Sequence, residues 1–578
     1  MKILLSFVLA FLASVNVHSQ NLEWLISAGG LKSDKATTVV VDDNGYSYVT
    51  GYYNEQAQFG PFDTGFSFSS SKEVFVAKID PTGNYVWVKN GVNYYDDRGL
   101  GLCLDPAGNI YVTGTCWGGL TFGSMSLYNS TSYTDQIYVV KLDTDGNTIW
   151  IKNAGNDPGG YPYNDDHGQD IISDSDGNLY LTGFISNNAD TPNNATFDAI
   201  SIPLIPHDSL AFVAKLTNDG TWLWVRTFDG IYEYRDNAVA VDDENNVYVA
   251  GGFDLTRTFG TSSITAVGQE DIFVVKYDEN GNFLFVRQAG GLRKDRADAI
   301  AFGNDGHLYL TGEFRDTCNF GVAHLNNYGS ASGKDIFVAK MSKSGVWKWA
   351  IKAGSNKGSD RGTGICVNNS GNVFVSGQFS GEAKFGPDIL LDSDGDSVQL
   401  FVAGIDTLGN WRWAKEGGGL DFDRAASVAC DDNCNVYFTG YYAITMTVDS
   451  LSVTAVSGKE IFTGKFTDAC FGYSASPPGG PGGEEEYCEL LETNVFTPNG
   501  DHINDGLVFS TSCNMDGTVT IFNRWGEIVY QSNSLLEAWD GRTPAGILVQ
   551  DGTYFYTIEV RSKFGQKEKK DGFITVIR

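Results

Sequence analysis

An internal repeat constrains this chain more than any other feature of its sequence. A short apolar segment that ends in glycine recurs seven times, and its last residue is Gly51, Gly114, Gly183, Gly251, Gly312, Gly377 and Gly440. Successive copies are 61 to 69 residues apart. A unit of this length with several short apolar segments cannot bury them alone, so the units must pack against one another.

Each unit contains four apolar segments in a fixed order. The first follows an Asp-Arg pair in four units, which begin at Asp97, Asp295, Asp360 and Asp423. The third segment ends in lysine and the fourth carries tryptophan in most units, and turns such as Asp-x-x-Gly-Asn lie between segments. This alternation predicts a four-stranded antiparallel meander. The strands are apolar on both faces, so both faces of each sheet must be covered, as in sheets stacked around an axis.

The two ends of the repeat array complement each other. The chain opens with an isolated fourth segment at 23–30, whereas the seventh unit stops after its third segment at Lys465. If the opening segment completes the last unit, the ring closes and no sheet edge is exposed. We therefore predict an all-β fold with a seven-bladed β-propeller over residues 20–473. An open solenoid with a cap at each end is the alternative.

These repeats resemble the bacterial β-propeller repeat (SBBP-type) family, which is found in secreted and surface proteins. The resemblance extends from Trp24 to Lys465 and rests on the Asp-Gly-Asn, Tyr-Val-Thr-Gly and Asp-Ile-Phe-Val-Ala-Lys pieces. It implies a fold more firmly than an activity, because propellers serve many unrelated functions.

The N-terminus indicates export. Lys2 is followed by an apolar run at 3–15, and small or β-branched residues at 17 and 19 precede Gln20. The run is shorter than the roughly 20 residues that a membrane span needs, so residues 1–19 are predicted to be a secretory signal peptide. A buried N-terminal helix is the alternative. The formal net charge of −31 argues against nucleic acid as a partner.

Beyond the repeats, the composition changes twice. Residues 474–489 are rich in proline, glycine and glutamate, which is typical of an exposed linker. From residue 490 to 578, about seven short strand patterns with turn signals predict a small Ig-like β-sandwich.

This tail resembles the gliding-motility-associated C-terminal domain, the type B sorting domain of the type IX secretion system. The matching positions are Phe496, Pro498, Asn499, Asp501, Asn504, Asp505, Asn523, Arg524, Trp525, Gly526, Trp539, Asp540 and Gly541. His502 stands where the family usually has glycine. The resemblance implies export to the cell surface or medium, with the type IX machinery and its outer-membrane or surface attachment components as partners. It leaves open whether the tail is cleaved or retained.

Most residues of the tail are interpreted as structural. Trp525 and Trp539 are expected to be core anchors, and Gly526, Gly541 and Gly552 are expected to permit turns. Nine cysteines suit an oxidising compartment. Cys488 and Cys513 bracket the first strand region and are expected to form a disulfide, and Cys430 and Cys434 are a further candidate pair. Asn499, Asp501 and Asp505 offer oxygen ligands for Ca²⁺, although an Asx-turn without metal is the favoured interpretation.

The sequence contains no recognisable catalytic motif. HExxH, GxSxG and phosphate-binding loops are all absent. The Asp-Arg pairs and the third-strand lysines recur in most units, so we interpret them as contacts between units. Asp-x-Asp-Gly sequences at Asp143, Asp174 and Asp392 lack the later glutamate of a calcium loop. No catalytic residue, metal site or cofactor is therefore assigned in the propeller.

Function is expected where the repeats differ. The connection from each fourth strand to the next first strand varies, and in three units it carries tyrosine: Tyr94, Tyr95, Tyr161, Tyr163, Tyr232 and Tyr234. Exposed tyrosines suit stacking on sugars or docking of a protein, and folding back onto neighbouring loops is the alternative. The leading hypothesis is a non-catalytic binding or adhesion scaffold. An extracellular polysaccharide hydrolase or lyase, with acids at the mouth of the central channel, is the alternative hypothesis.

Overall fold

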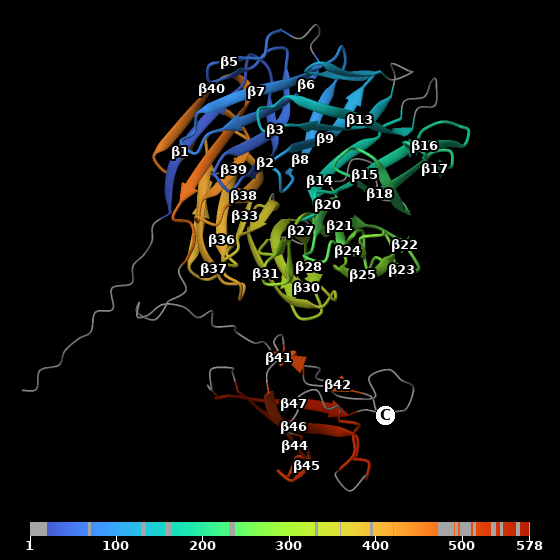
Figure 1. Cartoon of the computed structure of the whole chain (residues 1–578). Coiled ribbons are helices and arrows are strands. Elements are labelled where there is room, and N and C mark those ends of the chain that lie inside the picture. Colours follow the sequence, from blue (N-terminus) through green and yellow to red (C-terminus); the bar gives the residue numbers. More distant parts are fainter. Residues whose placement is uncertain are drawn as a thin grey trace, which may run out of the picture. The chain divides into compact units, whose positions relative to one another are not determined.

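The structure is a computed structural model of the whole chain (Figure 1). It describes residues 20–66, 71–128, 134–156, 164–229, 237–329, 333–358, 360–393, 397–419, 421–471, 490–491, 495–496, 510–511, 516–532, 539–543, 547–561 and 567–576. The chain divides into two compact units, Met1–Tyr473 and Ser474–Arg578. The described residues form strands and turns only, and they include no helix that could span a membrane.

The strands of the first unit follow the repeat. First strands are β2 (Lys35–Val41), β8 (Asp97–Leu104), β14 (His167–Ser173), β20 (Ala238–Val241), β26 (Arg296–Gly303), β32 (Arg361–Val367) and β38 (Arg424–Cys430). Second strands are β3 (Ser47–Asn54), β9 (Ile110–Trp117), β15 (Leu179–Asn187), β21 (Val247–Phe253), β27 (His307–Arg315), β33 (Val373–Ser380) and β39 (Val436–Val448). Third strands are β6 (Lys72–Ile79), β12 (Asp135–Leu142), β18 (Asp208–Leu216), β24 (Asp271–Tyr277), β30 (Lys334–Ser342), β36 (Val398–Ile405) and β40 (Leu451–Thr467). Fourth strands are β7 (Tyr85–Val92), β13 (Thr148–Asn156), β19 (Trp222–Asp229), β25 (Phe283–Ala289), β31 (Trp347–Ser355), β37 (Trp411–Gly418) and β1 (Asn21–Ala28).

Within each repeat the strands pair in sequence order as an antiparallel meander, as the turn spacing predicts. The last repeat takes its fourth strand from the start of the chain, because β1 pairs antiparallel with β40 and places Trp24 opposite Lys465. Figure 1 shows this contact as the blue β1 beside the orange β40. The predicted pairing of the opening segment with the last repeat is confirmed.

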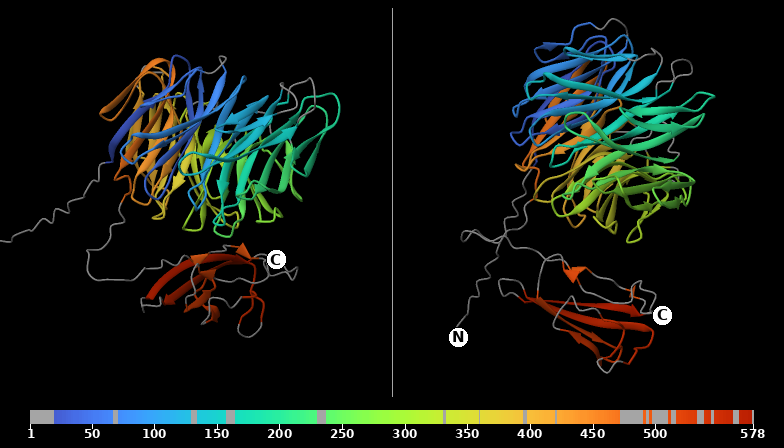
Figure 2. Two further views of the ribbon diagram at one scale, coloured as in Figure 1. Left: turned by 45° about the horizontal axis from the view of Figure 1, so that its top comes forward. Right: turned by 45° about the vertical axis from the view of Figure 1, so that its right-hand side comes forward.

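The first strands lie together at the inside of the unit. Each contacts the first strand of the next repeat, and β38 of the last repeat contacts β2 of the first. Figure 2 shows the sheets side by side in sequence order, from blue to orange. Apolar side chains fill the space between sheets, so that Trp24 and Tyr437 of the last repeat pack with Val49 and Phe75 of the first. The first unit is thus an all-β, propeller-like arrangement.

Short hairpins occupy most connections between second and third strands. They are β4 (Gln58–Phe59) with β5 (Phe62–Asp63), β10 (Gly119–Phe122) with β11 (Met125–Tyr128), β16 (Asn193–Phe197) with β17 (Ile200–Leu204), β22 (Thr256–Phe259) with β23 (Ser262–Thr265), β28 (Thr317–Asn319) with β29 (His324–Asn326), and β34 (Glu382–Phe385) with β35 (Ile389–Asp392). Several pair with the fourth strand of the preceding repeat: β10 with β7, β16 with β13, and β34 with β31. This pairing, which ties neighbouring sheets together at their outer strands, was not predicted from the sequence.

The described part of the second unit contains a five-stranded sheet and a strand pair. The sheet has the order β42 (Val495–Phe496), β47 (Lys567–Val576), β46 (Gly552–Arg561), β44 (Asp516–Phe522) and β45 (Ile528–Ser532), and β41 (Leu490–Leu491) pairs with β43 (Ser510–Thr511). One face of the sheet buries Val519, Tyr556 and Ile574 together with Trp539.

Candidate ligand-binding face

The aspartate that precedes each first strand holds the backbone of its own repeat. It is fully buried at Asp34, Asp97, Asp166, Asp295, Asp360 and Asp423. In all six cases one carboxylate oxygen accepts the backbone N–H of the residue 20 positions later, near the end of the second strand, at 2.8 to 3.3 Å. The aspartate therefore has a structural role within its own repeat in six of the seven repeats, and the fourth repeat has Asn237 at this position. The interpretation of the Asp-Arg pairs as contacts between units is thus wrong for these bonds of the aspartate.

Burial changes the titration of these aspartates. It raises the pKa of Asp34 to about 7, that of Asp295 to about 8, that of Asp360 to about 6 and that of Asp423 to about 7. Backbone N–H donors lower the pKa in each case, but they do not offset the loss of hydration.

The recurring lysine and tryptophan join one repeat to the next, at the ends of the strands opposite to those where the buried aspartates lie. The ammonium of the third-strand lysine and the indole N–H of the fourth-strand tryptophan donate to one carbonyl oxygen in the following repeat. The pairs are Lys78 and Trp87 to Thr144, Lys141 and Trp150 to Asn218, Lys215 and Trp224 to Glu279, Lys340 and Trp349 to Thr407, and Lys465 and Trp24 to Pro81. The interpretation of the lysines as contacts between units is confirmed.

The aromatic connection between the first and second repeats has a half-buried and an exposed tyrosine. Tyr95 stacks on Trp117, with ring centroids 5.0 Å apart, whereas Tyr94 meets Tyr95 edge-on at 5.4 Å and is 65% exposed. Tyr95 thus folds back onto the end of β9, whereas the ring of Tyr94 is exposed to the solvent. The other tyrosines predicted for this face, Tyr161, Tyr163, Tyr232 and Tyr234, lie outside the described residues.

Trp117 is a member of this aromatic cluster that sequence reasoning missed. It is the last residue of β9, and its N–H donates to the buried Asp97 at 3.3 Å. The equivalent position is polar or small in the other repeats, which have asparagine, serine, aspartate, arginine or alanine there, for example Asn54 and Ser380. A tryptophan at this position in one repeat alone was the sequence signal that could have identified Trp117.

Charged side chains lie next to the aromatic cluster. Asp96 bonds Lys72 Nζ at 2.5 Å and Arg98 Nη2 at 3.4 Å. Burial raises the pKa of Asp96, but the hydrogen bonds and positive charge of Lys72, with Arg98, more than offset it and lower that pKa. Both cations also lie 5.9 Å from the ring centroid of Tyr52. The face therefore combines an exposed phenol ring with a fixed ionic group, a combination suited to binding polar ligands.

The two tryptophans predicted as core anchors of the tail differ. Trp539 is 1% exposed and lies in the core of the second unit, as expected. Trp525 is 72% exposed, so the prediction for this residue is wrong. It lies at the tip of a turn in which Asn523 Oδ1 accepts the N–H groups of Trp525 and Glu527, and the Arg524 guanidinium lies 4.7 Å from its ring centroid. A turn tip between two strands has no sheet face to bury it.

The other sorting-motif residues are described only in part. Gly526 and Gly541 have φ of 83° and 76°, which confirms their turn role, and Asp540 accepts the N–H of Arg542. Phe496 ends β42. The motif residues Pro498, Asn499, Asp501, Asn504 and Asp505 lie outside the described residues, as do Cys488 and Cys513. The predicted disulfide and the Ca²⁺ ligands Asn499, Asp501 and Asp505 are among them.

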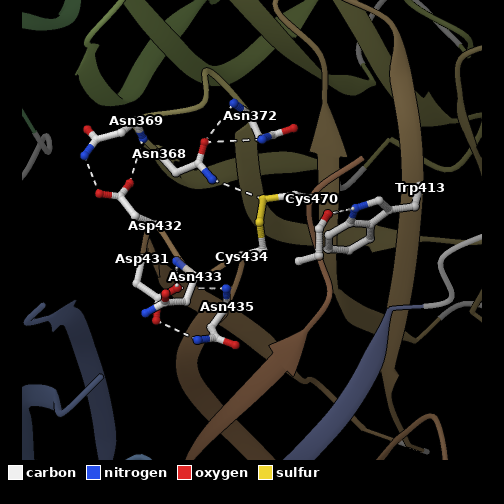
Figure 3. The surroundings of a disulfide bond; sticks show 11 residues. Asn368, Asn369, Asn372, Trp413, Asp431, Asp432, Asn433, Cys434, Asn435 and Cys470 are labelled. Carbon is white, nitrogen blue, oxygen red and sulfur yellow. Dashed lines mark hydrogen bonds between the residues drawn. A yellow bond between two sulfur atoms is a disulfide. The ribbon is translucent and has the colours of Figure 1, made fainter. Parts of the chain in front are cut away.

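A disulfide in the first unit joins Cys434 to Cys470 (Figure 3). The candidate pair Cys430 and Cys434 is wrong, since Cys430 is a free thiol. Cys434 has φ of 65° in a turn position that most other repeats fill with glycine, and its sulfur bonds that of Cys470 in the segment after β40. Among the described residues, no group of three or more His, Cys, Asp or Glu side chains is placed to hold a metal ion.

Residues 490–576 match the family described as the CHU_C type IX secretion signal domain. A domain of this kind implies contact with the type IX secretion machinery and a location outside the cell or at its surface. The match covers the C-terminal unit and says nothing of the repeats.

Other relatives are distant. A WD repeat-containing protein, L264, of Acanthamoeba polyphaga mimivirus is 22% identical over an alignment 518 positions long, which covers 72% of this chain and 36% of that protein. The chain thus spans about a third of the length of this curated relative. A quinohemoprotein alcohol dehydrogenase of Pseudomonas putida aligns over 80% of this chain and 78% of its own at 10% identity, with a TM-score of 0.37. The NanB sialidase of Streptococcus pneumoniae aligns over 72% and 91% at 10% identity, with a TM-score of 0.33.

Proposed function

We propose that this protein is a surface or secreted binding scaffold, in which a C-terminal signal domain delivers a seven-bladed β-propeller through the type IX secretion system. The observation that carries the proposal is the family match of residues 490–576. Residues 1–19 serve as a signal peptide for the first export step, 474–489 serve as the linker, and the tail acts as a type B sorting domain with an Ig-like sandwich fold.

The propeller architecture is supported by strand pairing and by contacts between repeats. Seven first strands contact one another in a cycle, and β1 supplies the fourth strand of the last sheet. A ring of this kind has no free sheet edge, which protects an exported protein from edge-to-edge aggregation.

A non-catalytic role is supported by the tasks that the repeated polar residues already perform. The aspartates hold backbone N–H groups, and the lysines hold the next repeat, so neither set is available to act on a substrate. Ligand binding falls to the connections at the starts of the first strands, where Tyr94 is exposed beside the Asp96 ion pairs. A polysaccharide hydrolase or lyase would need unrepeated acids that face the solvent at the mouth of the central channel.

Deletion of residues 490–578, followed by cell fractionation, tests the export assignment. We expect the truncated protein to accumulate in the periplasm and to be lost from the surface and the medium. The single variant Tyr94→Ala, which changes an exposed residue of the first unit and leaves the tail intact, is the control for general effects on expression. Surface delivery that is unchanged without the tail would contradict the proposal.

A further inference from the structure

A second group of charges lies between the last and first repeats, at the same ends of the strands as the Asp96 ion pairs. We call Lys35, Arg424 and Lys459 the basic cluster. Lys35 begins β2 opposite Tyr52, and Arg424 begins β38 opposite Tyr441. Lys35 Nζ lies 4.6 Å and Lys459 Nζ 5.0 Å from the ring centroid of Tyr441. Two repeats thus bring two ammonium groups to one phenol ring and place Arg424 opposite that tyrosine in the neighbouring strand.

No carboxylate compensates the basic cluster within the described part of the chain. None of its three cations forms an ion pair there, and Arg424 Nε is buried without a described hydrogen-bond partner. The equivalent arginines of the fifth and sixth repeats differ. Arg296 and Arg361 both bind the buried carboxylate of Asp298, at 2.8 and 2.7 Å. The fold can therefore neutralise cations at this position, and it does not do so at the basic cluster.

The electrostatic cost of this arrangement is visible at Lys35. Burial lowers the pKa of Lys35, and the positive charges of Lys459, Arg424, Arg98 and Lys72 lower it further. The whole chain carries a formal charge of −31, so an uncompensated positive group is an exception to its composition. An anion bound between these cations would relieve the repulsion.

The aromatic cluster of Tyr94, Tyr95 and Trp117 lies at the same ends of the strands, between the first and second repeats. Arg98 is the second residue of β8, contacts Tyr52 and bonds Asp96. Asp96 follows Tyr94 and Tyr95 in sequence. Cations and an open phenol ring are therefore neighbours on one face. This combination fits a chain of sugar rings with acidic groups better than a small free anion, because a ring face can stack on Tyr94 while its acidic group meets a cation.

We propose that the basic cluster binds the carboxylate or sulfate groups of an acidic polysaccharide, with Tyr94 as a stacking site for the same chain. This inference rests on the binding role proposed above for this face.

Titration of the purified full-length protein with matched pairs of polymers tests the inference. Polygalacturonate is compared with its methyl ester, and dextran sulfate with dextran, so that each pair differs in charge and shares a backbone. We expect binding of at least one acidic member and weakening of that binding by salt. The variant Lys35→Gln/Arg424→Gln/Lys459→Gln should weaken it by about tenfold or more.

A control variant separates local from overall charge. Lys348→Gln/Lys384→Gln/Arg412→Gln removes the same charge from outer strands β31, β34 and β37, and should change the affinity by less than about threefold. Thermal unfolding of both variants checks that each is folded.

Three results would overturn the inference. One is equal binding by the cluster variant and the parent protein. Another is equal binding of inorganic sulfate and polymer per charge, which would assign the cluster to a free anion. The third is binding of the neutral polymers alone, lost in Tyr94→Ala, which would leave the binding role of the face intact and remove the basic cluster from it.

Discussion

The indole N–H of Trp24 donates a hydrogen bond to the carbonyl oxygen of Pro81, 3.0 Å away, and thereby joins the last repeat to the first. Lys465 donates to the same oxygen at 3.2 Å. Four other lysine and tryptophan pairs make the equivalent bonds between consecutive repeats, so the contact at the closure of the array is the same as those within it. The ends of the array are held by side-chain contacts as well as by the β1–β40 strand pair.

Loss of the Trp24 hydrogen bond should weaken this closure. Trp24→Phe keeps an aromatic ring in the core but removes the donor, and we expect the free energy of unfolding to fall by about 1 kcal/mol. Glu23→Gln, which removes the partly exposed ion pair with Lys465, is the control and should cost less than about 0.5 kcal/mol. Denaturant unfolding of the two variants checks this, and equal stability of Trp24→Phe and the parent protein would contradict it.

The buried aspartates predict that stability falls as the pH rises. A group whose pKa is higher in the folded protein than its ordinary value stabilises the fold at low pH and loses that contribution as the pH passes its folded pKa. The folded pKa values lie between about 6 and 8 for Asp34, Asp295, Asp360 and Asp423, above the ordinary 3.8. Thermal unfolding should therefore occur at higher temperature at pH 5.5 than at pH 8.

The variant Asp295→Asn is the control for this pH dependence. The asparagine does not titrate, so the difference in unfolding temperature between pH 5.5 and pH 8 should shrink, although the variant loses the bond from the Gly291 N–H. A stability that rises with pH over this range in the parent protein would contradict the assignment.

The disulfide should contribute strongly to the last repeat. Cys434 and Cys470 are 36 residues apart, and closure of a loop of this length stabilises a fold by roughly 3–4 kcal/mol in the chain-entropy model. We expect Cys434→Ser/Cys470→Ser to unfold at a markedly lower temperature than Cys430→Ser. Peptide mapping without reduction tests the connectivity directly, and a Cys430–Cys434 peptide would show that the assigned pairing is wrong.

The two neighbouring tyrosines should respond differently to substitution. Tyr95→Ala loses the stack on Trp117 and should lower the free energy of unfolding by about 1 kcal/mol or more. Tyr94→Ala removes an exposed ring, so stability should change by less than about 0.5 kcal/mol while ligand binding weakens. Thermal unfolding and polysaccharide titration of both variants measure the two effects. Equal loss of stability would show that Tyr94 is not a surface residue.

Trp525 and Trp539 should contribute differently to the stability of the second unit. Trp539→Ala empties a core site and should destabilise the second unit by about 3–5 kcal/mol, whereas Trp525→Ala should leave its folding unchanged. Limited proteolysis of the full chain measures this difference, because cleavage at sites after residue 473 reports unfolding of the second unit. Equal proteolytic sensitivity of the two variants would contradict the difference in burial.

Several structural features followed from the order of residues. Apolar segments of strand length, separated by turns with aspartate, glycine and asparagine, determine a meander because strands and tight turns depend on neighbours close in sequence. The unmatched ends of the array gave the pairing of Trp24 with Lys465 for the same reason, since a missing strand and a spare strand can be counted. The repetition of aspartate and lysine also indicated a structural role, because a catalytic site needs its residues only once.

Other features were decided by the tertiary structure, because they depend on which side chains from different repeats become neighbours. Trp117 supports Tyr95, and Cys434 reaches Cys470 instead of Cys430. Asp298 neutralises two arginines, while Lys35, Arg424 and Lys459 have no described carboxylate partner. The sequence determined the repeated sheet and the C-terminal secretion signal domain. Whether a given charge or ring is paired, buried or open to a ligand was settled only when the sheets met, since burial and electrostatic compensation act through space.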